Sequence, residues 1–140
     1  MAYLDTSVLA AYYCPEPLSA AVQEAIAQDE DPVISRLVEV ELFSAVAAKV
    51  GVGELDTAAA GRVLSLFCEH LSDGRYRIVP LDSAEHETAC RWIAQFTVPL
   101  RSADGLHLAA TDTNGLTIAT SDGQLARAAG ELGVDFRLIA

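Results

Sequence analysis

The feature that most constrains this chain is its alternation of short β-branched or apolar runs with longer segments of helical periodicity. Strands separated by helices pair in parallel, and the helices then cover both faces of the sheet. We therefore expect strands at 3–4, 33–34, 77–79, 116–120 and 136–139, and helices at 6–13, 18–28, 36–50, 56–71, 82–95, 103–112 and 123–131.

The predicted architecture is a single α/β domain over residues 1–140, a three-layer sandwich with a central parallel sheet of four to five strands. Hydrophobic residues make up 51% of the chain, which favours a compact core over disorder. No run approaches the roughly 18 apolar residues of a membrane span, so we expect no membrane partner. Three cysteines without a C-x-x-C pair predict reduced thiols and a cytoplasmic location.

The net charge of −11 argues against a general nucleic-acid binder, which is normally basic. Carboxylates gathered at one site repel an anion unless a divalent cation neutralises them. The negative charge therefore fits a metal site at least as well as it excludes RNA binding.

Four acidic residues follow predicted strands or begin the helices after them. Asp5 ends the first strand, Glu41 lies in the helix after the second, Asp104 begins a helix, and Asp122 follows the fourth strand. Ligands of open α/β sheets bind outside the carboxyl ends of the strands, so these four side chains are expected on one rim. Each has a simpler explanation: Asp122 is equally suited to cap its helix, and Asp104 to complement a helix dipole.

Glu41 is the most informative of the four. Its neighbours one turn away on the helix, including Leu37, Val38, Ser44 and Ala45, carry no cation. A carboxylate on such an apolar stripe is costly unless a metal or a hydrogen-bond network compensates its charge.

Four carboxylates without a His or Cys ligand set favour Mg²⁺ or Mn²⁺ over zinc. Such an ion binds phosphates and activates water, which predicts hydrolysis of a phosphodiester to 5′-phosphate and 3′-hydroxyl ends. We expect Asp5 and Asp104 to bind the ion directly, and Glu41 and Asp122 to bind it directly or through water.

Neighbouring hydroxyl groups are predicted to orient these carboxylates; they belong to Thr6, Ser7, Thr120 and Ser121. His107 follows Asp104 by three residues and is placed to line the site, although a hydrogen-bonded core or surface histidine is the more common case.

Four segments together resemble the motifs of the PIN domain family. They are Tyr3–Leu9 around Asp5, Ile34–Leu42 around Glu41, Leu100–Ala109 around Asp104, and Leu116–Asp122. They cover the chain in order and at family-like spacing. Gly105 departs from the pattern, since an alanine is more usual after this aspartate.

The size of the chain makes it similar to the VapC-type toxins of bacterial toxin–antitoxin pairs. This resemblance implies a PIN-like fold and an endoribonuclease that depends on Mg²⁺ or Mn²⁺. It also implies an RNA substrate, a homodimer, and inhibition by a cognate VapB-type antitoxin whose tail places a basic side chain near the acidic site. The helices at 6–13 and 18–28 are candidates for the antitoxin groove, or are ordinary core.

Arg36 and Arg101 lie closest in sequence to Glu41 and Asp104, so they are candidates for RNA contact. Arg36 is equally placed to pair with Glu39 on the surface.

Two other classes of function compete with the nuclease. A PIN-like module that binds RNA or a partner without cutting is the main alternative, and the complete acid set argues against it. A phosphotransfer enzyme or receiver domain fits poorly, because Ser7 stands where a dehalogenase-like enzyme needs a second aspartate and the only lysine is Lys49.

Overall fold

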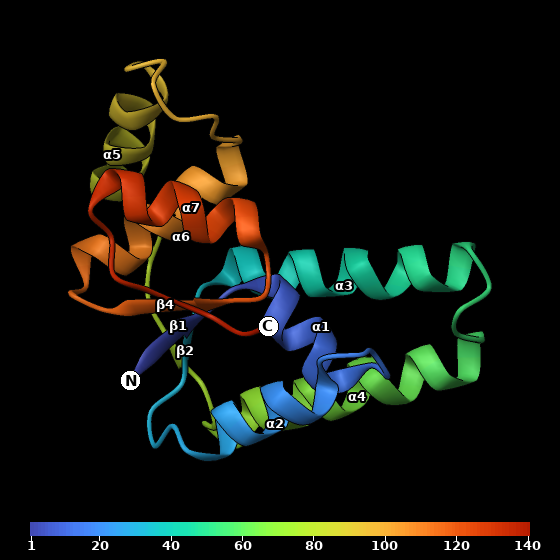
Figure 1. Ribbon diagram of the computed structural model, residues 1–140. Helices are drawn as coiled ribbons and strands as arrows, with labels where there is room; N and C mark the ends of the chain where they lie inside the picture. The colour runs from blue at the N-terminus through green and yellow to red at the C-terminus, as the bar shows by residue number, and fades with distance from the viewer.

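The five predicted strands form one parallel sheet in the computed structural model, which describes residues 1–140. The strand order is β3-β2-β1-β4-β5 (Figure 1). The strands are β1 (Ala2–Leu4), β2 (Val33–Ile34), β3 (Arg77–Ile78), β4 (Thr117–Thr120) and β5 (Phe136–Leu138).

All seven predicted helices are present, with boundaries that differ from the expected ones by a few residues at most. They are α1 (Thr6–Tyr13), α2 (Ser19–Ala27), α3 (Arg36–Gly51), α4 (Thr57–Ser72), α5 (Ser83–Ile93), α6 (Ser102–Thr113) and α7 (Gly123–Leu132). Helices α1, α2 and α4 lie below the sheet in Figure 1, and α6 and α7 lie above it. The prediction of an α/β sandwich is confirmed.

The core is built where the central strands meet the helices. Tyr3 and Ile118 from β1 and β4 are fully buried, as are Val8, Leu42 and Leu108 from three of the helices. The two edge strands differ from the expectation that each strand is a buried apolar run, because every residue of β3 and β5 is exposed. Both are edge strands, with a neighbouring strand on one side only.

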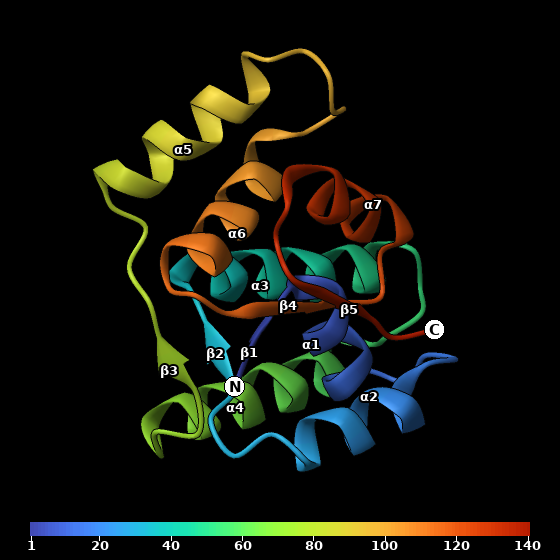
Figure 2. The ribbon, with the colours of Figure 1, turned by 60° about the vertical axis from the view of Figure 1, so that its left-hand side comes forward.

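Helix α5 stands at the periphery and packs against α6 (Figure 2). The two helices approach closely at Gly105, where a Cβ atom would lie 3.3 Å from the Cβ of Ala89. The missing side chain at Gly105 thus lets α5 approach α6, which gives a packing reason for the departure from the family pattern at this position.

The strand order places the switch point between β1 and β4. From β1 the chain winds outward through β2 to β3, and then returns to the other side of β1 to form β4 and β5. Leu4 pairs with Ala119, so the residues that follow these two strands lie side by side at the carboxyl edge. This crevice is where open α/β sheets bind ligands.

Two further sequence expectations concern the chain as a whole. None of its helices combines the length and apolar character that crossing a bilayer requires. The three cysteines form no disulfide; Cys14 is buried, and Cys68 and Cys90 are exposed.

Candidate metal centre

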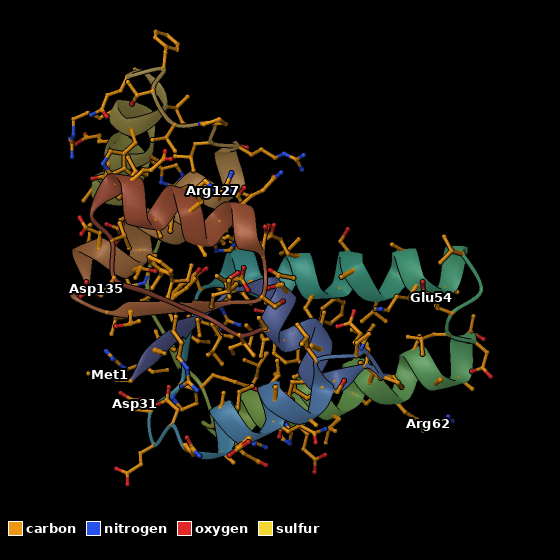
Figure 3. The ribbon with its side chains drawn as sticks, in the orientation of Figure 1. Met1, Asp31, Glu54, Arg62, Arg127 and Asp135 are labelled. Atoms are coloured by element: carbon orange, nitrogen blue, oxygen red, sulfur yellow. The ribbon has the colours of Figure 1, made fainter.

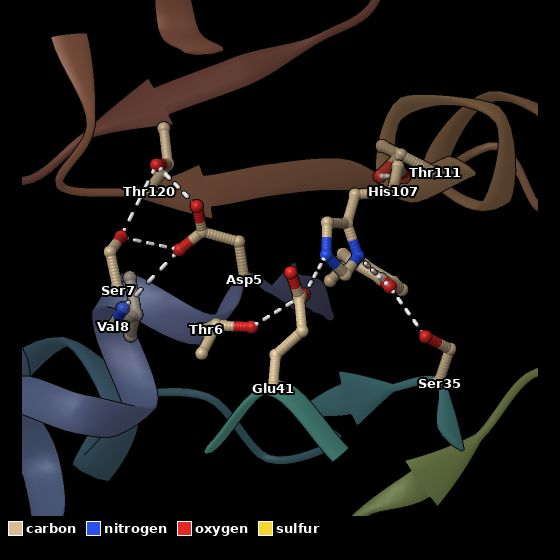
Figure 4. A network of polar contacts seen from close by, with 10 residues as sticks. Asp5, Thr6, Ser7, Val8, Ser35, Glu41, His107, Thr111 and Thr120 are labelled. Atoms are coloured by element: carbon tan, nitrogen blue, oxygen red, sulfur yellow. Dashed lines mark hydrogen bonds and ion pairs between the residues drawn. The ribbon is translucent and has the colours of Figure 1, made fainter. Parts of the chain in front are cut away.

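Asp5 is buried at the end of β1 and is held by three hydrogen bonds. The Ser7 hydroxyl donates to Oδ1 at 2.6 Å, the Thr120 hydroxyl donates to Oδ2 at 2.7 Å, and the backbone N–H of Val8 donates to Oδ1 at 3.2 Å (Figure 4). Burial raises the pKa of Asp5, against the lowering effect of these three donors. The side chain therefore has a fixed position but an incompletely compensated charge.

Glu41 projects from α3 toward the same edge and is half-buried. The Thr6 hydroxyl donates to its Oε1 at 2.9 Å, and Nε2 of His107 donates to the same oxygen. Burial alone would raise the pKa of Glu41, but the hydrogen bond and charge of His107, together with Thr6, lower it overall. The chain itself therefore supplies a hydrogen-bond network that compensates the charge of Glu41 on its apolar helix face.

His107 connects Glu41 to the core through a buried polar chain. Its Nδ1 lies 2.6 Å from the Tyr3 hydroxyl, which lies 2.7 Å from the Ser35 hydroxyl. A carboxylate only accepts hydrogen bonds, so Nε2 of His107 carries a proton toward Glu41. Tyr3, Ser35 and His107 are all buried, and every buried polar side-chain atom has a partner.

Asp104 differs from the first two carboxylates because no hydrogen bond or ion pair within the chain reaches it. It lies in the first turn of α6 and is half-buried. Burial raises its pKa, and the charges of Asp122 and Glu41 raise it further, against the lowering effect of His107 and Arg101. Of the four predicted carboxylates, Asp104 is therefore the one that has no hydrogen-bond partner within the chain.

Asp122 is the N-cap of α7, as its position before the helix also allowed. Its Oδ1 accepts from the backbone N–H groups of Gln124 at 2.9 Å and Leu125 at 3.4 Å. The side chain of Ser121 bonds no carboxylate; instead, its backbone N–H donates to the Ser7 hydroxyl at 3.0 Å. Ser121 thus acts on Asp5 only through Ser7.

The donor set is chemically suited to a hard divalent ion, although the chain holds no ready-made cage. No group of three or more His, Cys, Asp or Glu side chains is arranged so that it could hold an ion as it stands. Each of the four carboxylates keeps an oxygen that can still accept: Oδ2 of Asp5 has one donor, Glu41 and Asp122 use only one oxygen each, and Asp104 uses neither. Oxygen atoms of this kind are the ligands that Mg²⁺ and Mn²⁺ prefer.

The two arginines near the site have different surroundings. The Arg36 guanidinium lies 2.6 Å from the Glu39 carboxylate and forms the surface ion pair that the sequence offered as the alternative to RNA contact. Arg101 is the N-cap residue of α6, beside the first turn that carries Asp104. RNA contact by either residue stays a prediction.

The sequence did not reveal the full role of His107, which is both a core histidine and a neighbour of Glu41. Its spacing of three residues from Asp104 was the available signal, since i and i+3 share a helix face. Tyr3 and Ser35 gave no signal, because only the fold brings them to His107.

Comparisons with known proteins identify the family and the fold of this chain. The sequence matches the PIN domain over residues 2–131, so the chain belongs to the PIN domain family. No curated protein matches the sequence.

Several solved structures share the fold of this chain. VapC20 from Mycobacterium tuberculosis, described as a sarcin-ricin loop cleaving toxin, has a TM-score of 0.72 at 17% identity over 91% of this chain and 95% of its own. VapBC2 from Rickettsia felis, solved with a DNA fragment from its promoter, has a TM-score of 0.71 at 16% identity over 100% of both chains. FitAcB from Neisseria gonorrhoeae has a TM-score of 0.67 at 24% identity over 97% and 96%. The fold is thus that of toxins from toxin–antitoxin pairs.

Proposed function

We propose that this protein is a metal-dependent endoribonuclease and the toxin of a VapBC-type toxin–antitoxin pair. The observation that carries the proposal is Asp104, a half-buried carboxylate without a partner, beside the charges of Asp122 and Glu41. A divalent cation would compensate the charge of Asp104 and could also bind the free oxygens of the other carboxylates. Membership of the PIN domain family supports the same reaction class.

In the proposed site Asp5 and Asp104 would hold the ion directly, while Glu41 and Asp122 would hold it directly or through water. When bound, Mg²⁺ or Mn²⁺ lowers the pKa of water and stabilises negative charge on the phosphate. Ser7 and Thr120 fix the Asp5 carboxylate, and Thr6 and His107 fix Glu41, so little reorganisation precedes the reaction.

The proposed reaction is hydrolysis of an RNA phosphodiester. The oxygen of water forms a bond to phosphorus, the bond from phosphorus to the 3′-oxygen breaks, and a proton passes to the leaving 3′-oxygen. The products are a 5′-phosphate and a 3′-hydroxyl. Cyclic 2′,3′-phosphate ends would mean that the 2′-hydroxyl of RNA attacks instead, and this mechanism would be wrong.

The proposed partners are a VapB-type antitoxin and a second copy of the chain. The fold is shared with structures of such complexes, including VapBC2 from Rickettsia felis. An arginine or lysine of the antitoxin tail entering this group of carboxylates would be attracted strongly and would displace the ion. Helix α1 is a poor candidate for the whole antitoxin groove, since four of its eight residues are buried in the core.

The experiment is an RNA cleavage assay with the purified chain, with Mg²⁺, with Mn²⁺ and with a chelator. We expect cleavage only with the metals, and none in Asp5→Asn, which removes charge but little volume. Asp112→Asn is the matched control, because Asp112 is an exposed acid further along α6. Cleavage that survives in Asp5→Asn would contradict the site, and bound but uncut RNA in the wild type would favour a binding module.

A further inference from the structure

The nine lysine and arginine side chains fall into two sets. Ion pairs or hydrogen bonds within the chain hold five of them: Arg36, Lys49, Arg75, Arg77 and Arg91. The other four have neither: Arg62, Arg101, Arg127 and Arg137. Unpaired arginines are the side chains best placed to bind an anion in a chain with a net charge of −11.

Two of the four unpaired arginines border one groove that begins at Asp104. A cavity of about 280 Å³ has Arg101 and Asp104 in its wall, and a second cavity of about 300 Å³ has Arg127 in its wall. Pro99, Gln124 and Ala128 line both cavities, so the two cavities lie side by side along α7, and together we call them the α7 groove.

We infer that the α7 groove binds the RNA segment next to the cleaved phosphodiester, with Arg101 and Arg127 binding its phosphates. The inference rests on the proposed nuclease function, because Asp104 lies at one end of the groove. A guanidinium group matches a phosphate with two parallel hydrogen bonds. Single-stranded RNA is bound by such basic grooves that follow the backbone.

The remaining lining of the groove suits a nucleotide rather than a bare anion. Pro99 and Leu125 offer apolar surface to a ribose or a base. Gln124 makes no side-chain hydrogen bond within the chain, so its amide is free to bond a base edge. From Gln124 to Glu131 helix α7 rises about 10 Å, which suits a short stretch of RNA.

Two acids also line the groove and have to be accounted for. Asp104 stands at the end where the proposed cation would neutralise it. Glu131 stands four residues after Arg127 on α7 but forms no ion pair with it. With the cation bound, two arginines face one acid, so the groove carries a positive charge in an otherwise acidic chain.

Arg62 provides a matched control for these arginines. It is exposed and unpaired like Arg127, and it lies on α4, far from α7 (Figure 3). Replacing either residue with glutamine removes the same charge from the chain, so a difference between the two variants reports on position.

The test measures binding of a labelled, random-sequence single-stranded RNA oligonucleotide across a range of salt concentrations. The proteins carry Asp5→Asn, so that bound RNA is not cut. We expect Arg127→Gln and Arg101→Gln each to weaken binding by roughly fivefold and to lower the salt slope by about 0.7. Arg62→Gln should change neither quantity.

A kinetic comparison separates this inference from the proposed function. With Asp5 intact, Arg127→Gln should raise KM for RNA and leave kcat near the wild-type value, because Arg127 contacts no reacting atom. Equal binding, salt slope and KM in Arg127→Gln and Arg62→Gln would overturn the inference while cleavage still stands. Arg127→Gln weakening only the antitoxin complex would make the groove a partner surface and also overturn it. Failure of the wild type to cut RNA would instead refute the proposed function.

Discussion

Glu41 and Asp104 are two half-buried carboxylates at the same edge of the sheet, yet only Glu41 has hydrogen-bond donors, and the pKa values of the two shift in opposite directions. Glu41 accepts hydrogen bonds from Thr6 and His107, and its pKa is lowered. Asp104 receives none, and its pKa is raised by burial and by the neighbouring charges of Asp122 and Glu41. The fold compensates one charge itself and leaves the other for a group from outside.

In the proposed metal site the two carboxylates would have different roles. Groups that are already hydrogen-bonded keep the site in shape before an ion arrives. The uncompensated carboxylate of Asp104 would favour binding of an ion, because the ion would neutralise its charge. Substitutions of the two residues separate these roles.

The first prediction is that RNA cleavage depends on Glu41 and on Asp104 to the same extent. Glu41→Gln and Asp104→Asn should each lower the rate of RNA cleavage by about a thousandfold, as expected when several kcal/mol of transition-state stabilisation is lost. Initial rates with saturating Mn²⁺ measure this. A variant that retains more than about a tenth of the wild-type rate would show that its carboxylate lies outside the reaction.

The second prediction concerns the network that holds Glu41. His107→Ala should lower the free energy of unfolding by about 3 kcal/mol, because it leaves a cavity and removes a partner of the buried Tyr3 hydroxyl. Urea unfolding measures the change. His86→Ala is the control, since His86 is exposed and should change stability by less than about 0.5 kcal/mol. Similar losses in both variants would mean that the buried hydrogen-bond network of His107, Tyr3 and Ser35 contributes little to stability.

The sequence predicted the positions of the acids but only part of their surroundings. Periodicity and strand ends placed Asp5 and Asp122 on one rim, since those features depend on local patterns. The same patterns predicted that Glu41 needs a hydrogen-bond network or a metal, and the structure shows hydrogen bonds to it from Thr6 and His107. They could not show that Tyr3 and Ser35 would reach His107, because these contacts join residues 104 and 32 positions apart. They also could not show that Arg127 and Arg101 line neighbouring cavities.

The third prediction is that stability without metal moves in opposite directions in the two variants. Asp104→Asn should stabilise the chain by about 0.5 kcal/mol, because it removes an unpartnered charge at a functional site. Glu41→Gln should destabilise it by about 1 kcal/mol, because it weakens a charged hydrogen bond. Urea unfolding at neutral pH with a chelator measures both. Changes of the same sign would contradict the comparison.

The fourth prediction concerns how the contributions of Asp104 and Glu41 to folding stability change with pH. The pKa of Asp104 is raised in the folded chain, so its penalty is present at neutral pH and fades as pH falls toward about 3.9, the ordinary value for aspartate. The pKa of Glu41 is lowered, so its contribution persists to about pH 4.3 and is lost only below it.

Unfolding of the wild type and both variants at a series of pH values measures this behaviour. The stability gain of Asp104→Asn should shrink on acidification before the loss of Glu41→Gln does. The reverse order would show that the two pKa directions are wrong.

The most direct test of the central claim is calorimetric titration of Mn²⁺ into the wild type, Asp104→Asn and Asp112→Asn. We expect saturable binding in the wild type and in Asp112→Asn, and loss of that binding in Asp104→Asn, because Asp104 is the carboxylate whose charge the ion would compensate. Equal binding in all three proteins, or no binding in the wild type, would contradict the account.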